Sequence, residues 1–510
     1  MTYRSANRRL ILLAFLLFCV GKSVFGQERH YSIRHYDLSI KPDFKTRNVS
    51  VVATIEVDNP PDTLTFGLND RYDSVNVSSE SSPRIIERSD GWIRIALQKP
   101  SAHASIVFRL DGVLGKSNDE NREVISDSSL FLLWSDRFYP IDFDHWATVR
   151  IELTLPTGFQ AIAPGKVTEV DCSGATTVYV FETATPTLMF SVFADSRWIR
   201  TEREINGIHM QTLLYPAVQK YSNLIFQTSA EVLKFYSDTF CPYPFDQFSF
   251  VTLDHTYARR AFPGFVGYSP AYLEKELKTT GHDAHETALL WWDYTTKGSG
   301  PGSFQWTEGF GDYAEILYDE AYHKPIPAIF QRFRAEYLAL PAEQDVPYRD
   351  LRGNTPQKVV HGKYPWLMHL VRYVVGDSAF NRAMKLVFRR FAFRTFSMDE
   401  FISTLENRSG QTLRWWRTEW LERKGVPEIA FKSEIQKSRS RYLVTCVIEQ
   451  QKNIYHLPLE IGIESTDGLQ IEKLTSNERR MTFTFESKKQ PTKIVLDPHG
   501  WVLIKQVPLR

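Results

Sequence analysis

A histidine and a glutamate stand side by side at His285 and Glu286, and a second glutamate, Glu308, follows in the same stretch, HETALLWWDYTTKGSGPGSFQWTEGF. Such residues build zinc sites on helices. Two histidines one turn apart face the same ion, and a glutamate between them can take a proton from zinc-bound water. One turn after His285, however, stands Leu289, which offers no lone pair. The residues that could hold a metal are therefore His285 and Glu308, an incomplete set.

The segments that would position these residues fall into three regions by their hydrophobic periodicity. Residues 31–198 contain short alternating stretches such as HYDLSIKPDF and VRIELTLP, separated by turn-forming clusters, which predicts antiparallel strands. From about Pro216 apolar residues recur at helical spacing, with one strand expected at 248–254. Alternation returns after Pro427 and predicts a small terminal β-sandwich. We expect an α+β multidomain chain, with a signal peptide at 1–26 and domains at 27–198, 199–425 and 426–510.

The N-terminal residues have the pattern of an export signal. Arg4, Arg8 and Arg9 precede the apolar run LILLAFLLFCV, and small residues follow up to an expected cleavage site after Gly26. The run is too short to span a bilayer comfortably, and no later segment approaches ~18 consecutive apolar residues. The mature chain is expected to be exported to the periplasm or the extracellular space, without a transmembrane anchor.

Composition narrows the expected chemistry further. The chain carries 61 basic and 60 acidic side chains, so the basic excess of a nucleic-acid-binding protein is missing. After cleavage, three cysteines remain, Cys172, Cys241 and Cys446, far apart and odd in number. They predict buried thiols rather than a disulfide framework or a cysteine metal site.

The pair HE followed by TEGFGDYAE resembles the His-Glu-x-x-His, eighteen residues, Glu pattern of the gluzincin alanyl-aminopeptidases, the membrane alanine aminopeptidase-like zinc metallopeptidases of peptidase family M-one. HYDLSIKPDF is similar to the family's opening strand, and FYSDTFCPYPFDQFSFVTLD to the segment around its Phe-Gly-x-Tyr-Pro-Tyr motif. The likeness covers nearly all of the mature chain. It implies an N-terminal β domain, a thermolysin-like, mostly helical metallopeptidase-type domain and a C-terminal β-sandwich, without the long C-terminal helical domain of many members.

The resemblance also assigns roles to the residues of the first motif. His285 and Glu308 match the first and third zinc ligands, and Glu286 matches the general base. Leu289 stands where the family has its second histidine, which implies that a zinc ion would keep two protein ligands and lose most of its affinity.

Two further segments depart from the family's pattern. The family binds a substrate's free amine through the Glu of a Gly-x-Met-Glu segment, and YARRAFPGFVGY places Ala261 there, beside Arg259 and Arg260. Two cations would repel an amine and favour a carboxylate. The family's oxyanion-stabilising tyrosine is replaced by His361 in HGKYPW, an imidazole that can serve the same purpose, with Tyr364 a remote substitute.

Each of these residues also has a purely structural interpretation. LLWW at 289–292 is typical of core packing. Arg259 and Arg260 are typical of solvated side chains at a strand end, and His361 of a hydrogen-bonded structural histidine.

Two hypotheses follow. The first is an exported homologue that has lost peptidase activity and retains a peptide-accepting cleft, and the joint loss of metal ligand, amine anchor and oxyanion tyrosine favours it. The second is an active zinc metallopeptidase of altered specificity, with a rearranged metal set that adds His282 or Asp293, with Glu286 as base and His361 supporting the oxyanion. The incomplete set predicts that zinc, the expected cofactor, binds weakly or not at all. A peptide or protein is the expected ligand.

Overall fold

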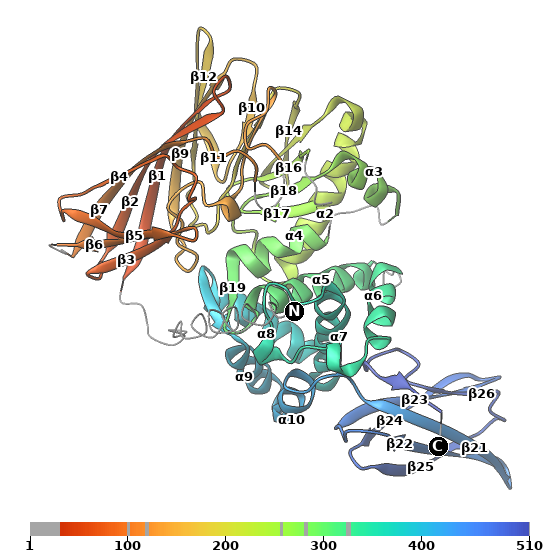
Figure 1. Cartoon of the computed structure of the whole chain (residues 1–510). Helices are drawn as coiled ribbons and strands as arrows, with labels where there is room; N and C mark the ends of the chain where they lie inside the picture. The colour runs from red at the N-terminus through yellow and green to blue at the C-terminus, as the bar shows by residue number, and fades with distance from the viewer. Residues whose placement is uncertain are drawn as a thin grey trace, which may run out of the picture.

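The computed structural model describes residues 31–98, 102–117, 122–254, 259–279, 284–322 and 328–508. The signal peptide expected at 1–26, and His282, lie outside the described residues. Within them the chain is a mixed α/β multidomain molecule. Strands occupy both ends of its long axis and most helices lie between them (Figure 1).

The N-terminal strands form a seven-stranded sheet in the order β11-β12-β9-β1-β2-β7-β4. In β2 every second side chain is buried, as a strand with one face on a core requires. β1 pairs antiparallel with β2 but parallel with β9, so the prediction of an antiparallel domain is wrong at this pair. A long crossover between β1 and β9 makes parallel pairing possible. The bounds are β1 Ser32–Asp43, β2 Asn48–Asp58, β4 Ser74–Ser78, β7 His103–Gly112, β9 Thr148–Pro156, β11 Lys166–Ser173 and β12 Thr176–Glu182.

Two three-stranded sheets, β3-β6-β5 and β10-β13-β8, complete the N-terminal part of the chain. The 3-10 turn η1, Trp134–Asp136, follows β8 and brings Trp134 toward the helical region. The strands are β3 Thr63–Gly67, β5 Pro83–Ser89, β6 Trp92–Leu97, β8 Ser129–Leu132, β10 Gln160–Ile162 and β13 Val192–Asp195.

A five-stranded sheet in the order β14-β15-β16-β18-β17 follows, with β17 as its outermost strand. The sequence predicted the strand at 248–254 but neither β17 nor β18. Both are four residues long, and β18 is buried on both faces, so it shows no alternation. Phe193, Phe262 and Phe265 pack together behind this edge in a separate apolar cluster. The bounds are β14 Ile199–Ile205, β15 Ile208–Leu214, β16 Phe248–Thr252, β17 Arg259–Phe262 and β18 Phe265–Tyr268.

The helices begin with α2 and α3 and then the short α4, which passes directly into a π-helical turn, η3. The next helix, α5, packs against both α4 and α7. α9 begins with a capping box, in which Ser397 and Glu400 bond each other's backbone N–H. The bounds are α2 Ser222–Thr239, α3 Pro270–Thr279, α4 His285–Leu289, η3 Leu290–Thr295, α5 Ser303–Ala321, α6 Ala328–Leu338, α7 Gln357–Val375, α8 Asp377–Phe391, α9 Met398–Ser409 and α10 Arg414–Trp416; β19 Thr296–Ser299 and β20 Arg394–Ser397 pair between them.

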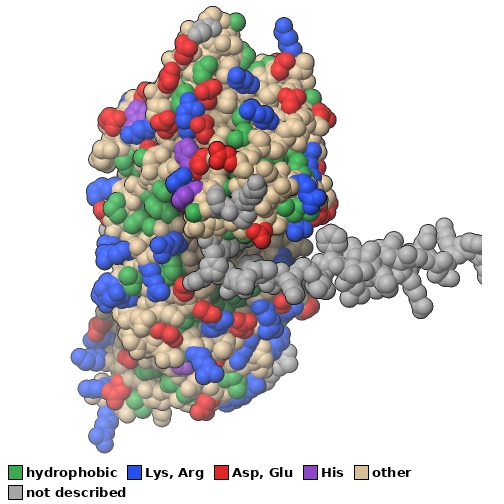
Figure 2. Space-filling view, turned by 90° about the vertical axis from the view of Figure 1, so that its left-hand side faces the viewer, with side chains coloured by type: hydrophobic (Ala, Val, Ile, Leu, Met, Phe, Trp, Pro, Cys, Tyr) green, Lys and Arg blue, Asp and Glu red, His purple; other side chains and the backbone are tan. Residues whose placement is uncertain are grey.

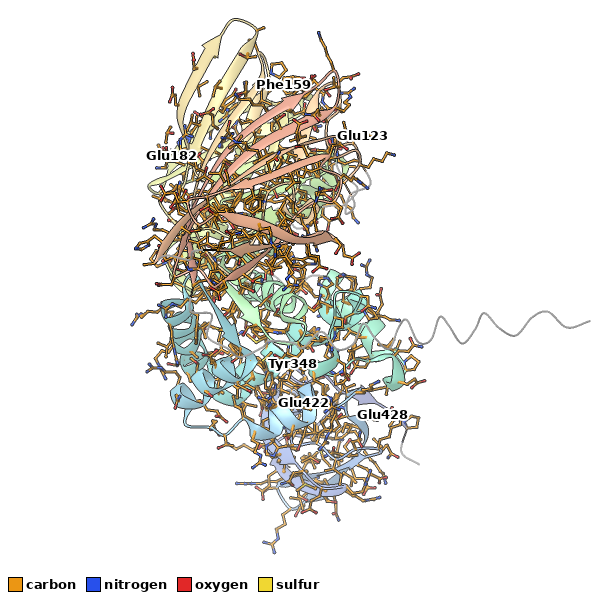
Figure 3. All side chains as sticks on the ribbon, turned by 60° about the vertical axis from the view of Figure 1, so that its left-hand side comes forward. Glu123, Phe159, Glu182, Tyr348, Glu422 and Glu428 are labelled. Atoms are coloured by element: carbon orange, nitrogen blue, oxygen red, sulfur yellow. The ribbon has the colours of Figure 1, made fainter. Side chains whose placement is uncertain are left out.

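The last part of the chain forms two further sheets, β25-β22-β21-β27 and β24-β23-β26. Trp501 joins them to the helices by stacking on His369 of α7. Figure 3 places Tyr348, Glu422 and Glu428 at the level where helices and terminal strands meet. The bounds are β21 Glu428–Ser438, β22 Arg441–Gln450, β23 Leu457–Ser465, β24 Gly468–Ser476, β25 Arg480–Ser487, β26 Lys493–Leu496 and β27 Lys505–Gln506.

The surface carries charges of both signs, and the three cysteines differ in their exposure. On the face drawn in Figure 2, basic and acidic side chains are interspersed with apolar ones. Cys446 is buried, but Cys241 is half-buried and Cys172 is exposed, so the prediction of three buried thiols is wrong for two of them. Among the described residues no helix has the length and apolar character needed to cross a membrane.

Candidate active-site region

His285 is the first residue of α4 and lies buried between two carboxylates of α5. Its Nε2 is 3.2 Å from Oε1 of Glu308, and its Nδ1 is 2.9 Å from Oδ1 of Asp312. Glu308 and Asp312 are one turn apart, so both project from the same face of α5 toward α4. The structure therefore brings together the two residues of the incomplete metal set and adds Asp312, which the sequence analysis did not identify.

The charges around His285 decide its protonation. Burial and the Arg259 charge lower its pKa, but Asp312 and Glu308 outweigh them and hold the pKa well above the ordinary 6.5. Burial raises the pKa of Glu308, but the hydrogen bond and charge of His285 outweigh it, and the net pKa is lowered. The two carboxylates therefore favour the imidazolium form of His285 over the neutral ring.

Glu286, which the resemblance predicts as the general base, forms an ion pair with Arg259 of β17. Nε of Arg259 lies 3.1 Å from Oε1 of Glu286, and its Nη1 lies 2.9 Å from Oε1 of Glu276 on α3. The Arg259 side chain is 15% exposed, so the interpretation of this residue as solvated is wrong. Burial raises the pKa of Glu286, and the charges of His285 and Arg259 only partly offset it.

Leu289 stands where the resemblance predicts a second histidine. Its side chain is buried against α5, where Gly311 has no Cβ: a Cβ there would lie 2.6 Å from Cδ2 of Leu289. Trp291 and Trp292, which follow in η3, are also buried. The prediction that LLWW packs in the core is confirmed.

The segment that matches the amine anchor lies on β17, beside η3. Ala261 is buried, and its carbonyl oxygen accepts a hydrogen bond of 2.9 Å from the Tyr294 hydroxyl. The Arg260 guanidinium lies over the ring of Trp134, with 5.6 Å to the ring centroid. Residue 261 is alanine, so the position where the resemblance predicts an amine-binding glutamate carries no carboxylate.

His361, at the position of the oxyanion tyrosine, has both ring nitrogens bonded within the protein. Its Nδ1 is 2.7 Å from Oδ2 of Asp312, its Nε2 contacts the Gln357 side chain, and its ring stacks on Phe333. Asp312 therefore bridges His361 and His285, whose ring centroids are 6.3 Å apart. These contacts favour the structural interpretation of His361.

Tyr364, the remote substitute for the oxyanion tyrosine, is fully buried on α7. A Cβ at Gly309 would lie 2.4 Å from Cβ of Tyr364, so this residue packs against α5. Burial raises the pKa of its phenol well above 10. Tyr364 is not among the residues that line the cavity beside β17.

Asp293, a candidate for a rearranged metal set, lies in η3. Its Oδ1 accepts a hydrogen bond of 2.7 Å from Oγ1 of Thr307. Burial, with the charge of Glu308, raises its pKa to about 7. In the part of the chain that the structure describes, no group of three or more His, Cys, Asp or Glu side chains is arranged to hold a metal ion.

A cavity of about 620 Å³ opens beside these residues. Its apolar walls come from Trp134, Tyr294, Phe304 and Leu289, and Gln357 is among its polar residues. Arg259, Arg260, Glu286, Asp293 and Glu308 also reach it. The arrangement offers aromatic surface, amide groups and ionic groups that are largely paired with one another.

The sequence matches no protein-family model and no curated protein. A search of solved structures finds the crystal structure of Legionella pneumophila aminopeptidase A in complex with aspartic acid, with a TM-score of 0.74 and 13% sequence identity. The match covers 95% of this chain and 60% of that chain. At this identity the likeness establishes only that the two chains share a fold. The gluzincin assignment stays a prediction.

Proposed function

We propose that this chain is an exported, non-catalytic relative of the aminopeptidases that binds peptides in the cavity beside β17. One observation carries the proposal: the side chains that a zinc peptidase needs for metal and water are bonded to other protein groups. His285 is held by Glu308 and Asp312, and Glu286 is held by Arg259. Both His285 and Glu286 therefore already have a charged partner within the protein.

A zinc ion does not fit this set of residues. Leu289 carries no donor atom, and His285 is already in contact with the carboxylates of Glu308 and Asp312, so α4 offers one histidine where the predicted zinc pattern needs two. Only His285 and Glu308 would remain of the expected trio, and they are already paired with each other. We therefore assign no hydrolytic step to this site.

Peptide binding is supported by the fold and by the cavity. The fold is shared with an aminopeptidase, and the cavity combines aromatic walls with side-chain amides, groups that suit apolar side chains and peptide bonds. The edge of β17 that pairs with no other described strand is partly blocked, because the Tyr294 hydroxyl already donates a hydrogen bond to the carbonyl of Ala261. Recognition by side-chain insertion is therefore favoured over addition of a strand to β17.

The test combines metal content, turnover and binding on the mature chain, residues 27–510. Elemental analysis is run beside a Glu308→Ala variant, and hydrolysis of aminoacyl and peptide substrates is followed with and without added zinc. We expect no zinc above background and no turnover, while a peptide library yields ligands whose binding is weakened by Phe304→Ala. Stoichiometric zinc that is lost in Glu308→Ala, with turnover, would instead establish the rearranged zinc peptidase.

A further inference from the structure

Arg259 is a cation with a largely buried side chain, paired with carboxylates on two different helices. From β17 it reaches Glu276 on α3 at 2.9 Å and Glu286 on α4 at 3.1 Å. Its guanidinium also lies 5.7 Å from the ring centroid of Tyr272. The side chains of Glu276 and Glu286 are 10% and 6% exposed. Arg259 thus cross-links the strand and the two helices in a region largely shielded from water.

The contact with Glu286 places Arg259 next to the incomplete metal set. The same oxygen, Oε1 of Glu286, lies 3.1 Å from Nε of Arg259 and 3.9 Å from Nε2 of His285. A guanidinium keeps its charge at any working pH. A fixed positive charge in contact with Glu286 repels a divalent cation that enters the site. Solvent and salt screen this repulsion only weakly, because the groups are largely buried.

We propose that Arg259 is an internal cation that replaces a metal in this site and excludes one from it. The inference rests on the proposed absence of a resident metal. It adds that Leu289 and Arg259 act together to keep a metal out of the site. Leu289 removes a ligand, and Arg259 supplies the positive charge that the buried carboxylates need. Restoring the histidine alone does not restore the metal.

A matched set of variants tests this. Leu289→His restores the donor, and Leu289→His with Arg259→Gln also removes the internal cation. The control is Leu289→His with Arg260→Gln, which makes the same charge change at the neighbouring residue, whose guanidinium lies over Trp134. A fourth variant adds Glu276→Gln to the Arg259→Gln pair, so that one carboxylate is neutralised together with the cation and folding is protected. Circular dichroism checks each fold, and zinc is added to each full-length mature protein in a calorimetric titration.

We expect one zinc per chain only in the variants that lack Arg259, with affinity at least about 100-fold above that of Leu289→His. Zinc should also raise their Tm by ~5 °C or more and leave that of the Arg260→Gln control unchanged. Equal zinc affinity with and without Arg259, or no zinc in folded variants that lack it, would overturn the inference. Zinc binding by the unmodified chain would instead overturn the proposed function, so the two failures are distinct.

Discussion

Oδ1 of Asp312 lies 2.9 Å from Nδ1 of His285, deep in the contact between α5 and α4. The other oxygen of the same carboxylate is 2.7 Å from Nδ1 of His361 on α7. Asp312 is 1% exposed, and the two imidazoles lower its pKa far below 3.8 although burial alone raises it. One buried anion therefore ties three helices together.

Asp312→Asn should be strongly destabilising, because it removes the anion and leaves two buried imidazoles facing a neutral amide. We expect a loss of about 3–5 kcal/mol in the free energy of unfolding at pH 7, measured by urea denaturation. Asp467→Asn, at an exposed turn, is the control and should change it by less than about 0.5 kcal/mol. A loss below about 1 kcal/mol for Asp312→Asn would mean that the bridge contributes little.

The sequence indicated some residues of this site but not which side chains pair with one another. The spacing of the first motif placed His285 and Glu308 together, and the structure has them 3.2 Å apart; their role as metal ligands stays a prediction. The spacing of Asp312, one turn after Glu308, indicates that both carboxylates share a face of the same helix. Its histidine partners lie on other helices, so the sequence does not identify them. The burial of Arg259 could not be predicted, because its partner Glu276 lies on a helix whose orientation the sequence does not give.

The fold was predictable where periodicity is strong. The alternating segments of β1, β2 and β9 are strands, and the part of the α+β prediction that expected a multidomain chain with both sheets and helices is confirmed. The parallel pairing of β1 with β9 was not predictable, because register and order depend on contacts between distant segments. β18, buried on both faces, gave no periodic signal. The domain bounds expected from the sequence stay predictions.

Asp293 should make stability depend on pH. Its folded-state pKa of about 7 lies above the ordinary 3.8, because the carboxyl is buried. The raised pKa therefore contributes to the stability of the fold in full below pH ~4. That contribution is lost as the pH rises through 7. Asp293→Asn retains the acceptor for Thr307 and removes the titration. We expect it to raise the free energy of unfolding at pH 8 by about 1–3 kcal/mol, with no gain near pH 4, in paired urea titrations. An equal effect at both pH values would exclude titration as the cause.

Trp501 should anchor the terminal sheets to α7. Its ring stacks on His369 at 4.2 Å and on Tyr373 at 5.1 Å, both with interplanar angles of 19°. Burial and nearby arginines lower the pKa of His369 to about 3, so this stack carries no imidazolium at neutral pH. Trp501→Ala should cost about 2 kcal/mol and make the terminal sheets unfold at a lower temperature than the helices, as calorimetry can resolve. Trp92→Ala, at a half-exposed site on β6, should leave the shape of the transition unchanged.

The contact between Leu289 and Gly311 can be tested by a double-mutant cycle. A Cβ at position 311 would lie 2.6 Å from Cδ2 of Leu289, so Gly311→Ala forces that side chain to move within a packed core. In the Leu289→Ala background the obstacle is gone, and the alanine should stabilise α5 through its higher helix propensity. We expect Gly311→Ala to be more favourable in that background by about 1–2 kcal/mol, from urea unfolding of the four proteins. A coupling near zero would mean that Leu289 does not fill the space between α4 and α5, and its place at the second-histidine position would then need another explanation.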